Sequence, residues 1–390
     1  MPTTERMTSP HKARYQVVVV GGGPAGASCA LALALAGVTD ILVIEAGSYG
    51  DIRIGESIPP EGRMYLRGLG IEAAFLAQGH EPCYGSCSYW GSDKRGYNDF
   101  LLNPNGHGWH LDRRKFDQLL ASQARAAGVE LLTERSLLTS KPASGGGYTL
   151  SIGGAGRDVF RVRADFVVDA SGTRASFARQ RGAKRMNSNP LVCIAARLPR
   201  SDADAPFSKL TQLEAVEHGW WYVASVPGNS VVVMLATHAQ AVGTMRLHQP
   251  ENWYRLLGST AHLSRLVGGL GTNPYQLQLK SCPAPSYCLD TLCGDQWLAI
   301  GDAASAYDPV TAQGIIKSLM NGTSAAKAIQ SEISGNPCAI KEFEQSLRTQ
   351  YRRYLETRHY FYGLERRWPR SEFWRIVQQD IDVRRATPGQ

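Results

Sequence analysis

The residues with the most specific chemistry form a glycine-rich turn near the start of the 390-residue chain. The turn reads Gly-Gly-Gly-Pro-Ala-Gly over 21–26, between the β-branched run Tyr15–Val20 and an Ala/Leu-rich stretch that predicts a helix. Glycines at this spacing let the backbone approach a pyrophosphate at a helix N-terminus. A second apolar run, Ile41–Ile44, ends at Glu45, where an acid can bind ribose hydroxyls. These elements predict a dinucleotide-binding βαβ unit.

Two later segments carry polar residues after buried-type strands. Phe166–Asp169 leads into Ala-Ser-Gly at 170–172, and Trp297–Ile300 leads into Gly-Asp at 301–302. Tyr-Asp-Pro and Gln-Gly-Ile follow within 307–315, where a long helix is predicted to begin. The glycine turn alone fits NAD or FAD, and these two segments decide between them.

With the three motifs in this order, residues 15–335 resemble the single-component flavin monooxygenase superfamily, which has the fold of p-hydroxybenzoate hydroxylase. The resemblance implies an α/β fold: a Rossmann-type FAD-binding domain, an antiparallel β-sheet substrate domain and a C-terminal helical segment. It also implies FAD as cofactor and O2 as co-substrate, with reduction by NAD(P)H directly or through a flavin reductase. In that family the acid matching Asp302 binds the ribityl chain, and backbone N–H groups matching Gly314 and Ile315 face the flavin ring.

The resemblance extends to the flavin-dependent halogenases through Gly-Glu-Ser-Ile-Pro at 55–59, here called the strap, and through the motif beginning at Asp169. The family's helix-opening arginine falls on Arg113. The predicted cofactor-binding residues are Gly21, Gly23, Pro24, Ala25, Gly26, Glu45, Ala46, Glu56, Ser57, Ile58, Arg113, Asp169, Gly172, Asp302, Pro309, Gln313, Gly314 and Ile315.

The residues that make a halogenase are missing. Halogenases carry a lysine downstream of the strap that directs hypohalous acid, but no lysine occurs between Lys12 and Lys94. Thr311 and Ala312 stand where tryptophan halogenases have Glu and Ser. We therefore expect a hydroperoxyflavin whose oxygen enters the substrate, which is hydroxylation and not halogenation.

The Tyr-Asp-Pro segment and an aromatic, Arg-rich tail resemble a narrower group, the flavoproteins that mature quinone-cofactor enzymes such as lysine and glycine oxidases and quinohemoprotein amine dehydrogenase. This resemblance implies hydroxylation of a tryptophan or indole group on a partner protein or carrier. Three alternatives stay open: a halogenase of an aromatic natural-product precursor, a flavin-dependent reductase of prenyl double bonds, and an FAD-binding escort protein without turnover.

Hydroxylating a ring requires aromatic stacking and a group that handles a proton. The predicted substrate residues are Tyr84, Tyr89, Trp90, Trp220, Trp221 and Tyr222, and the catalytic candidates are His107, His110 and Asp308. Alternation along a strand sends Trp220 and Tyr222 to one face and Trp221 to the other, so at most one set lines the pocket. The alternative is that these aromatics pack a core, the histidines make structural hydrogen bonds and Asp308 caps a helix.

Composition sets the remaining expectations. The net charge is +8, and the basic residues are dispersed except towards the C-terminus; we expect no nucleic-acid partner. The eight cysteines show no metal-ligand spacing, and no apolar run is long enough for a membrane span, so we expect a cytoplasmic protein without a metal. The predicted divisions are a flexible N-terminus at 1–14, an FAD-binding domain at 15–185 and 285–335, a substrate-binding β-sheet domain at 186–284, and a C-terminal helical region at 336–390.

Overall fold

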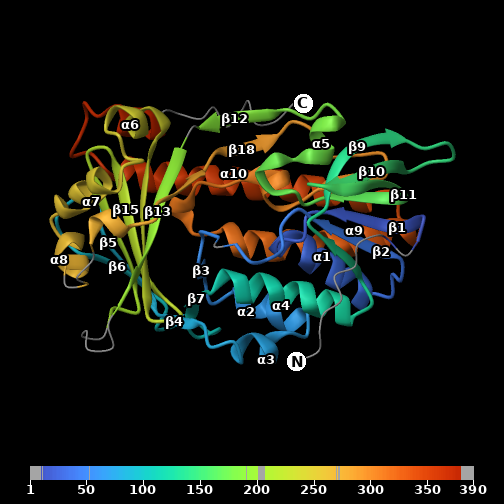
Figure 1. Cartoon of the computed structure of the whole chain (residues 1–390), viewed down its shortest axis with the longest axis horizontal. Coiled ribbons are helices and arrows are strands. Elements are labelled where there is room, and N and C mark those ends of the chain that lie inside the picture. The colour runs from blue at the N-terminus through green and yellow to red at the C-terminus, as the bar shows by residue number, and fades with distance from the viewer. Residues whose placement is uncertain are drawn as a thin grey trace.

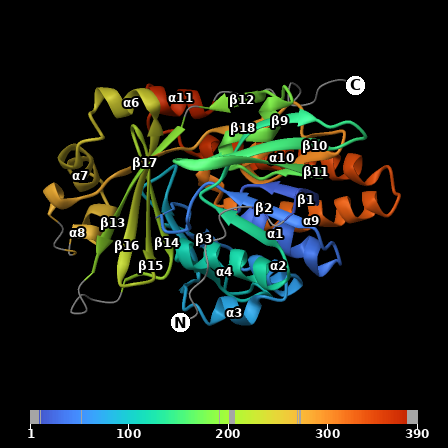
Figure 2. The same cartoon turned by 45° about the vertical axis from the view of Figure 1, so that its right-hand side comes forward.

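The computed structural model describes residues 10, 12–51, 53–189, 191–200, 207–268, 270 and 273–378. Two large β-sheets lie along the long axis of the molecule, with helices packed around both (Figures 1 and 2). The helix α10 (Ala339–Leu364) reaches both halves, because Phe343 packs in the core of the first sheet and Tyr362 in a core of the second. This α/β architecture with C-terminal helices confirms the predicted fold class.

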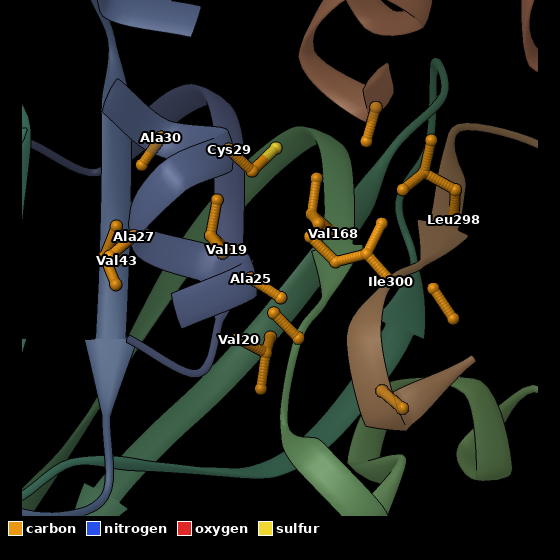
Figure 3. Packing of buried hydrophobic residues seen from close by; sticks show 14 of the residues in the cluster. Val19, Val20, Ala25, Ala27, Cys29, Ala30, Val43, Val168, Leu298 and Ile300 are labelled. Atoms are coloured by element: carbon orange, nitrogen blue, oxygen red, sulfur yellow. The ribbon is translucent and has the colours of Figure 1, made fainter. Parts of the chain in front are cut away.

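The first sheet has eight strands and is parallel at its centre, where β1 pairs with β2 and β11. Val17 and Val18 are fully buried, as expected of central strands covered on both faces. The small side chains Ala27 and Ala30 let the helix α1 (Pro24–Leu35) pack closely on these strands (Figure 3). The strands are β1 (Arg14–Val20), β2 (Ile41–Glu45), β8 (Glu130–Thr133), β9 (Ser136–Pro142), β10 (Tyr148–Gly154), β11 (Arg157–Asp169), β19 (Cys293–Gly294) and β20 (Trp297–Ala299).

The second sheet has seven strands in the order β17-β13-β16-β15-β14-β5-β6, antiparallel except for the β14–β5 pair. Trp221 packs with Trp253 on one face, and Trp220 packs with Tyr362 and Trp374 on the other. The strands are β5 (Gly85–Tyr89), β6 (Gly96–Asp99), β13 (Leu191–Pro199), β14 (Thr211–Val216), β15 (Gly219–Val226), β16 (Ser230–His238) and β17 (Lys280–Pro283).

Short elements connect the two halves. The small sheets are β3 (Ser57–Ile58) with β4 (Glu81–Cys83) and β7 (Gly108–His110), and β12 (Arg185–Asn189) with β18 (Ser286–Leu289) and β21 (Ser305–Ala306). The other helices are α1 (Pro24–Leu35), α2 (Gly62–Gly68), α3 (Glu72–Leu76), α4 (Arg113–Ala126), α5 (Ser176–Gln180), α6 (Ala239–Thr244), α7 (Pro250–Gly258), α8 (Leu263–Gly268), α9 (Gly314–Ile333) and α11 (Glu372–Gln378), with 3-10 turns η1 (Gly172–Arg174), η2 (Pro274–Gln276), η3 (Gly301–Ala303) and η4 (Pro309–Thr311).

The strands β13, β14, β15 and β16 are neighbours in the second sheet and lie within the β-sheet domain predicted at 186–284. This sheet also takes in β5 and β6, although the sequence analysis assigned their residues to the FAD-binding domain. The reason is that every second residue of β5 is buried and that this strand pairs with the distant strand β14. Of the predicted flexible N-terminus, residues 1–9 and 11 lie outside the described residues, as do 379–390 of the C-terminal region.

Candidate functional site

A cavity of about 720 Å³ is lined by residues of both sheets. Segments after β1, β2 and β11 form one part of its wall, and Cys193, Tyr222 and Met234 of the second sheet form another. Many predicted site residues meet here: Gly21, Gly23, Pro24, Ala25, Glu45, Ala46, Glu56, Ser57, Arg113, Gly172, Tyr222, Asp302, Asp308, Pro309, Gly314 and Ile315. Three motifs that are far apart in the sequence therefore face one space.

The glycine turn is open toward the cavity at Gly23 and tightly packed behind it. A Cβ on Gly23 would meet only Arg53 Nη1, at 3.7 Å. A Cβ on Gly26 would stand 1.9 Å from the Gly21 carbonyl oxygen. Gly26 therefore serves the packing of α1 and does not line the cavity, whereas Gly23 leaves room for a ligand at the N-terminus of this helix.

Glu45 is fixed as a hydrogen-bond acceptor at the end of β2. Its Oε2 accepts from the backbone N–H of Gly22 at 2.7 Å, and its Oε1 accepts from that of Gly47 at 2.9 Å. Arg53 Nη2 lies 3.2 Å from the same Oε1. A carboxylate held by three donors keeps its direction, which suits the hydroxyl donors of a ribose.

Arginine side chains give this end of the cavity a positive wall. Asp117, which is 2% exposed, accepts from Arg113 and from Arg53, each at 3.2 Å. Arg113 also donates to two neighbouring backbone carbonyl groups, at 3.1 and 2.9 Å. Arg135 and Arg174 line the same cavity. Guanidinium groups held in fixed positions favour an anionic ligand.

Asp169, at the end of β11, is wholly buried and shapes the turn that follows it. Its Oδ1 accepts from the backbone N–H and the hydroxyl of Ser171 at 3.0 and 2.6 Å. Its Oδ2 accepts from the backbone N–H groups of Phe177 and Ala178, both at 2.8 Å. Since protein donors occupy both oxygens and Asp169 does not line the cavity, its predicted contact with the cofactor is corrected to a structural role.

Asp302 is held in place by Lys317 of α9. The Lys317 side chain is buried, with 1% of the residue exposed. Lys317 Nζ donates to Asp302 Oδ1 at 2.7 Å and to the Ser305 carbonyl oxygen. The same ammonium lies 4.2 Å from the centre of the Tyr307 ring. The lysine therefore fixes both a carboxylate and an aromatic ring that line the cavity.

Two groups that can carry a proton lie at the strap and line the cavity: Glu56 of the strap, and Tyr222, whose hydroxyl lies beside Ser57. Burial raises the pKa of Glu56 to about 7 from an ordinary 4.5, and Arg113 offsets this only in part. Ser57 Oγ and Tyr222 Oη lie 3.0 Å apart. Burial, with a further contribution from Glu56, raises the pKa of Tyr222 well above 10. Tyr222 is thus a neutral phenol at physiological pH.

Asp308 forms the part of the wall nearest to α10. Its carboxylate accepts from Arg358 Nε at 3.2 Å and from the Tyr362 hydroxyl at 2.9 and 3.1 Å. The backbone N–H of Asp308 donates to the Tyr354 hydroxyl at 2.7 Å. Burial raises the pKa of the Asp308 carboxyl, and Arg358 offsets this in part. We call Asp308, Arg358 and Tyr362 the acid corner.

A protein-family model described as FAD binding domain matches residues 14–340. The chain belongs to the FAD binding domain family. It is 28% identical over 362 residues to LodB of Marinomonas mediterranea, named as an FAD-dependent oxidoreductase, and this match covers 92% of the chain and 96% of LodB. It is 26% identical over 354 residues to the flavin-dependent halogenase armH4 of Armillaria mellea, covering 82% of the chain and 65% of that protein.

Solved structures share the fold. The flavin-dependent halogenase CmlS has a TM-score of 0.84 at 23% identity, with 96% of this chain and 70% of CmlS covered. The peptidyl tryptophan dihydroxylase QhpG has a TM-score of 0.76 at 21% identity, with 95% of this chain and 80% of QhpG covered. The protein is thus an FAD-dependent oxidoreductase with a fold found in both halogenases and hydroxylases. Within the described part of the chain, no helix has the length and apolar character needed to cross a bilayer.

The cavity fits FAD. Gly23 and Gly314 both leave open space in front of the backbone, since a Cβ on Gly314 would meet no atom within 4 Å. The arginine wall suits the pyrophosphate, and Glu45 suits a ribose without a 2′-phosphate. Four of the predicted cofactor residues do not line the cavity: Gly26, Ile58, Asp169 and Gln313.

Neither predicted catalytic histidine reaches the cavity. His110 is fully buried, and its Nε2 lies 2.8 Å from Thr211 Oγ1. Burial lowers the pKa of His110 to about 4, so the ring is neutral at physiological pH. His107 Nδ1 lies 2.8 Å from the Gly108 carbonyl oxygen, and its ring packs against Trp109. Both histidines are structural, which corrects the catalytic prediction, and Asp308 alone of the three candidates lines the cavity.

Five of the six predicted substrate aromatics also lie away from the cavity. Trp221 packs against Trp253, and Trp220 donates from Nε1 to the Tyr362 hydroxyl at 3.1 Å. Tyr89 stacks on a histidine ring, Tyr84 is 48% exposed, and Trp90 donates to a backbone carbonyl of α10 at 2.7 Å. These residues pack cores and interfaces, so the prediction is corrected for Tyr84, Tyr89, Trp90, Trp220 and Trp221, and Tyr222 remains.

The side chains that support Glu45, Asp302 and Asp308 were not predicted from the sequence. Arg358 and Tyr362 lie on the same face of α10 as the buried Tyr351 and Leu355. A charged residue on this otherwise apolar face could have indicated a buried ion pair. Arg53 and Lys317 had no such signal, because their partners lie in other elements.

Proposed function

We propose that the protein is an FAD-dependent monooxygenase that hydroxylates an aromatic ring, preferentially the indole of a tryptophan carried by a partner protein or carrier. One observation carries this proposal: no lysine of the described residues lines the cavity, whereas a buried carboxylate and aromatic side chains do. Lys317 lies nearby, but its ammonium is committed to Asp302 and Ser305. The cavity therefore lacks the amine that halogenases use and keeps a group that accepts a proton.

The motifs divide the binding of FAD among them. The Gly21–Ala25 turn, the N-terminus of α1 and Arg113 hold the pyrophosphate, while Glu45 binds the ribose hydroxyls. Asp302, positioned by Lys317, binds the ribityl chain, and the backbone at Gly314 faces the flavin ring. FAD, once reduced, supplies the activation of dioxygen.

The second-sheet wall receives the substrate. Tyr222, Tyr307 and Met234 give it aromatic and apolar surface for an indole ring and exclude water. Asp308 accepts the proton that the ring loses when oxygen is added, and its raised pKa brings it closer to the range useful for a general base. Arg358 and Tyr362 hold the carboxylate in place for this step.

Delivery of the tryptophan by a partner is supported by the tail, although the tail is less exposed than its sequence suggests. Tyr351, Tyr354 and Arg358 are buried, and Arg367 is paired with Glu365. Among the exposed residues of the tail, we assign Arg352, Arg353, Tyr360 and Arg366 to contact with a partner. QhpG, which shares the fold, is named a peptidyl tryptophan dihydroxylase.

The competing function is halogenation, which the similarity to armH4 favours. The test supplies the holoenzyme with a reduced-flavin source, dioxygen, bromide and a tryptophan-containing peptide. We expect products that carry added oxygen only. A brominated product at any position would overturn the proposal. Running the assay with NADH alone and with NADH plus a flavin reductase separates direct reduction from reduction by a partner enzyme.

A further inference from the structure

Two cysteines stand directly opposite each other in the cavity wall. β13 and β17 are antiparallel neighbours, and their register pairs Cys193 with Cys282. Directly opposite residues project to the same face, with Cβ atoms about 4.5–5.5 Å apart. Both cysteines line the cavity, and both are free thiols.

The strand geometry brings the pair within reach of a disulfide. The backbone N–H of Ala284 donates to the carbonyl oxygen of Leu191 at 2.8 Å. Because hydrogen-bonded pairs recur at every second position of an antiparallel ladder, Cys193 and Cys282, two residues along, also form such a pair. Such pairs have Cα atoms about 5.5 Å apart, inside the roughly 4.4–6.8 Å that disulfides span. In the described part of the sheet β17 is an edge strand, so it can shift slightly to bring the two sulfurs together.

The two thiols differ in access. Cys282 is exposed, whereas Cys193 is 4% exposed. Burial raises the pKa of both thiols, so neither is a thiolate at neutral pH and both react slowly with dilute oxidants. An oxidant released inside the cavity, in contrast, meets the pair at a high local concentration.

We propose that Cys193 and Cys282 form an oxidisable dithiol site, which hydrogen peroxide released in the cavity converts into a cross-strand disulfide. The source of this oxidant rests on the proposed function, because reoxidation of reduced flavin by dioxygen without substrate yields hydrogen peroxide. No other two cysteines lie opposite each other in the described strand registers.

The reaction balances in two steps. The accessible sulfur of Cys282 attacks peroxide, an S–O bond forms as the O–O bond breaks, and one water leaves. The Cys193 sulfur then displaces the sulfenic oxygen as a second water, and the S–S bond forms. Together the thiols lose two electrons and two protons, and one peroxide becomes two waters. The product ties β17, with Pro283 and the adjoining cavity wall, to the sheet.

The test counts free thiols in the full-length holoenzyme by maleimide labelling and intact mass. In the first arm the enzyme is reduced with dithionite and reoxidised in air with catalase present and no aromatic substrate. In the second arm hydrogen peroxide is added directly. We expect two of the eight thiols to be lost in both arms, with a peptide pair joined at Cys193 and Cys282 that dithiothreitol separates.

Matched variants make the result specific. Cys282→Ser should keep its seven remaining thiols, because the sulfur that attacks peroxide is gone. Cys338→Ser, at the other exposed cysteine, should still lose two. Equal loss in Cys282→Ser, or no Cys193–Cys282 disulfide in either arm, would overturn the dithiol site. A disulfide in the peroxide arm alone would overturn the internal oxidant source and would count against the proposed oxygen chemistry, while the reactivity of the pair would stand.

Discussion

At the nucleotide end of the cavity a Cβ on Gly23 would meet one atom within 4 Å, whereas at the opposite end the Asp308 carboxylate already has Arg358 and Tyr362 against it. The first end is backbone left open for a ligand. The second is a buried charge whose partners are supplied by the protein. Binding FAD therefore completes one end, while folding of α10 completes the other.

This difference separates two kinds of mutational effect. Changes at Gly23 should reduce affinity for FAD and spare the fold, because the space in front of this residue is empty without a ligand. Changes in the acid corner should reduce the stability of the fold, because a buried charge loses its partner.

The largest effect is expected for Arg358→Met. It leaves the buried Asp308 carboxylate without its cation, which should lower the free energy of unfolding by about 3–5 kcal/mol. Urea denaturation measures the loss, and Arg353→Met, an exposed position on the same helix, should change stability by less than about 0.5 kcal/mol. The double variant Asp308→Asn/Arg358→Met should recover part of the loss. A loss below about 1 kcal/mol in the single variant would refute a buried, coupled acid corner.

The next effect concerns Glu56, which lies on the strap between the two ends. Its folded pKa of about 7 exceeds the ordinary 4.5, so the folded protein binds the proton more tightly than the unfolded chain. The free energy of unfolding should therefore fall as pH rises through this window, by about 3 kcal/mol in total. Glu56→Gln removes this dependence. Urea denaturation of both proteins at about pH 5 and about pH 8 measures it, and parallel pH profiles would contradict the prediction.

A somewhat smaller change, in the free energy of FAD binding, is expected at the nucleotide end. Gly23→Val projects into the space in front of the turn and should weaken FAD binding at least about 100-fold, or about 2.7 kcal/mol. Flavin fluorescence titration of the apoprotein measures the dissociation constant. Gly68→Val is the control, because a Cβ at this position would meet no atom within 4 Å and Gly68 lies outside the cavity. Full FAD occupancy in purified Gly23→Val would show that the turn does not hold the cofactor.

The smallest effect is expected outside the cavity. Arg352→Glu with Arg366→Glu should raise the KM for a protein-borne tryptophan about fivefold, or ~1 kcal/mol, and leave FAD content unchanged. The effect should shrink at high salt, because these side chains are exposed. Lys141→Glu, an exposed cation of the first sheet, is the control. If free tryptophan is hydroxylated as well as the protein-borne residue, docking through the tail is wrong.

The comparison also explains what the sequence reveals. The residues at the nucleotide end of the cavity lie close together in the sequence, so the Gly21–Gly26 turn and Glu45 could be predicted from their spacing alone. The acid corner joins Asp308 to residues 50 and 54 positions later, and no local pattern reports such a contact. His110 and Trp220 were misplaced because composition cannot tell a cavity wall from a core. The membership of β5 in the second sheet was not predicted because its partner strand β14 lies more than 100 residues away in the sequence.

The central claim is that dioxygen is the source of the atom added to the substrate. The direct measurement is the mass of a tryptophan-containing peptide after turnover under isotopically labelled dioxygen in unlabelled water, with bromide present. The account predicts one heavy oxygen atom for each hydroxyl group formed. Unlabelled oxygen in the product, or bromine in its place, would contradict it.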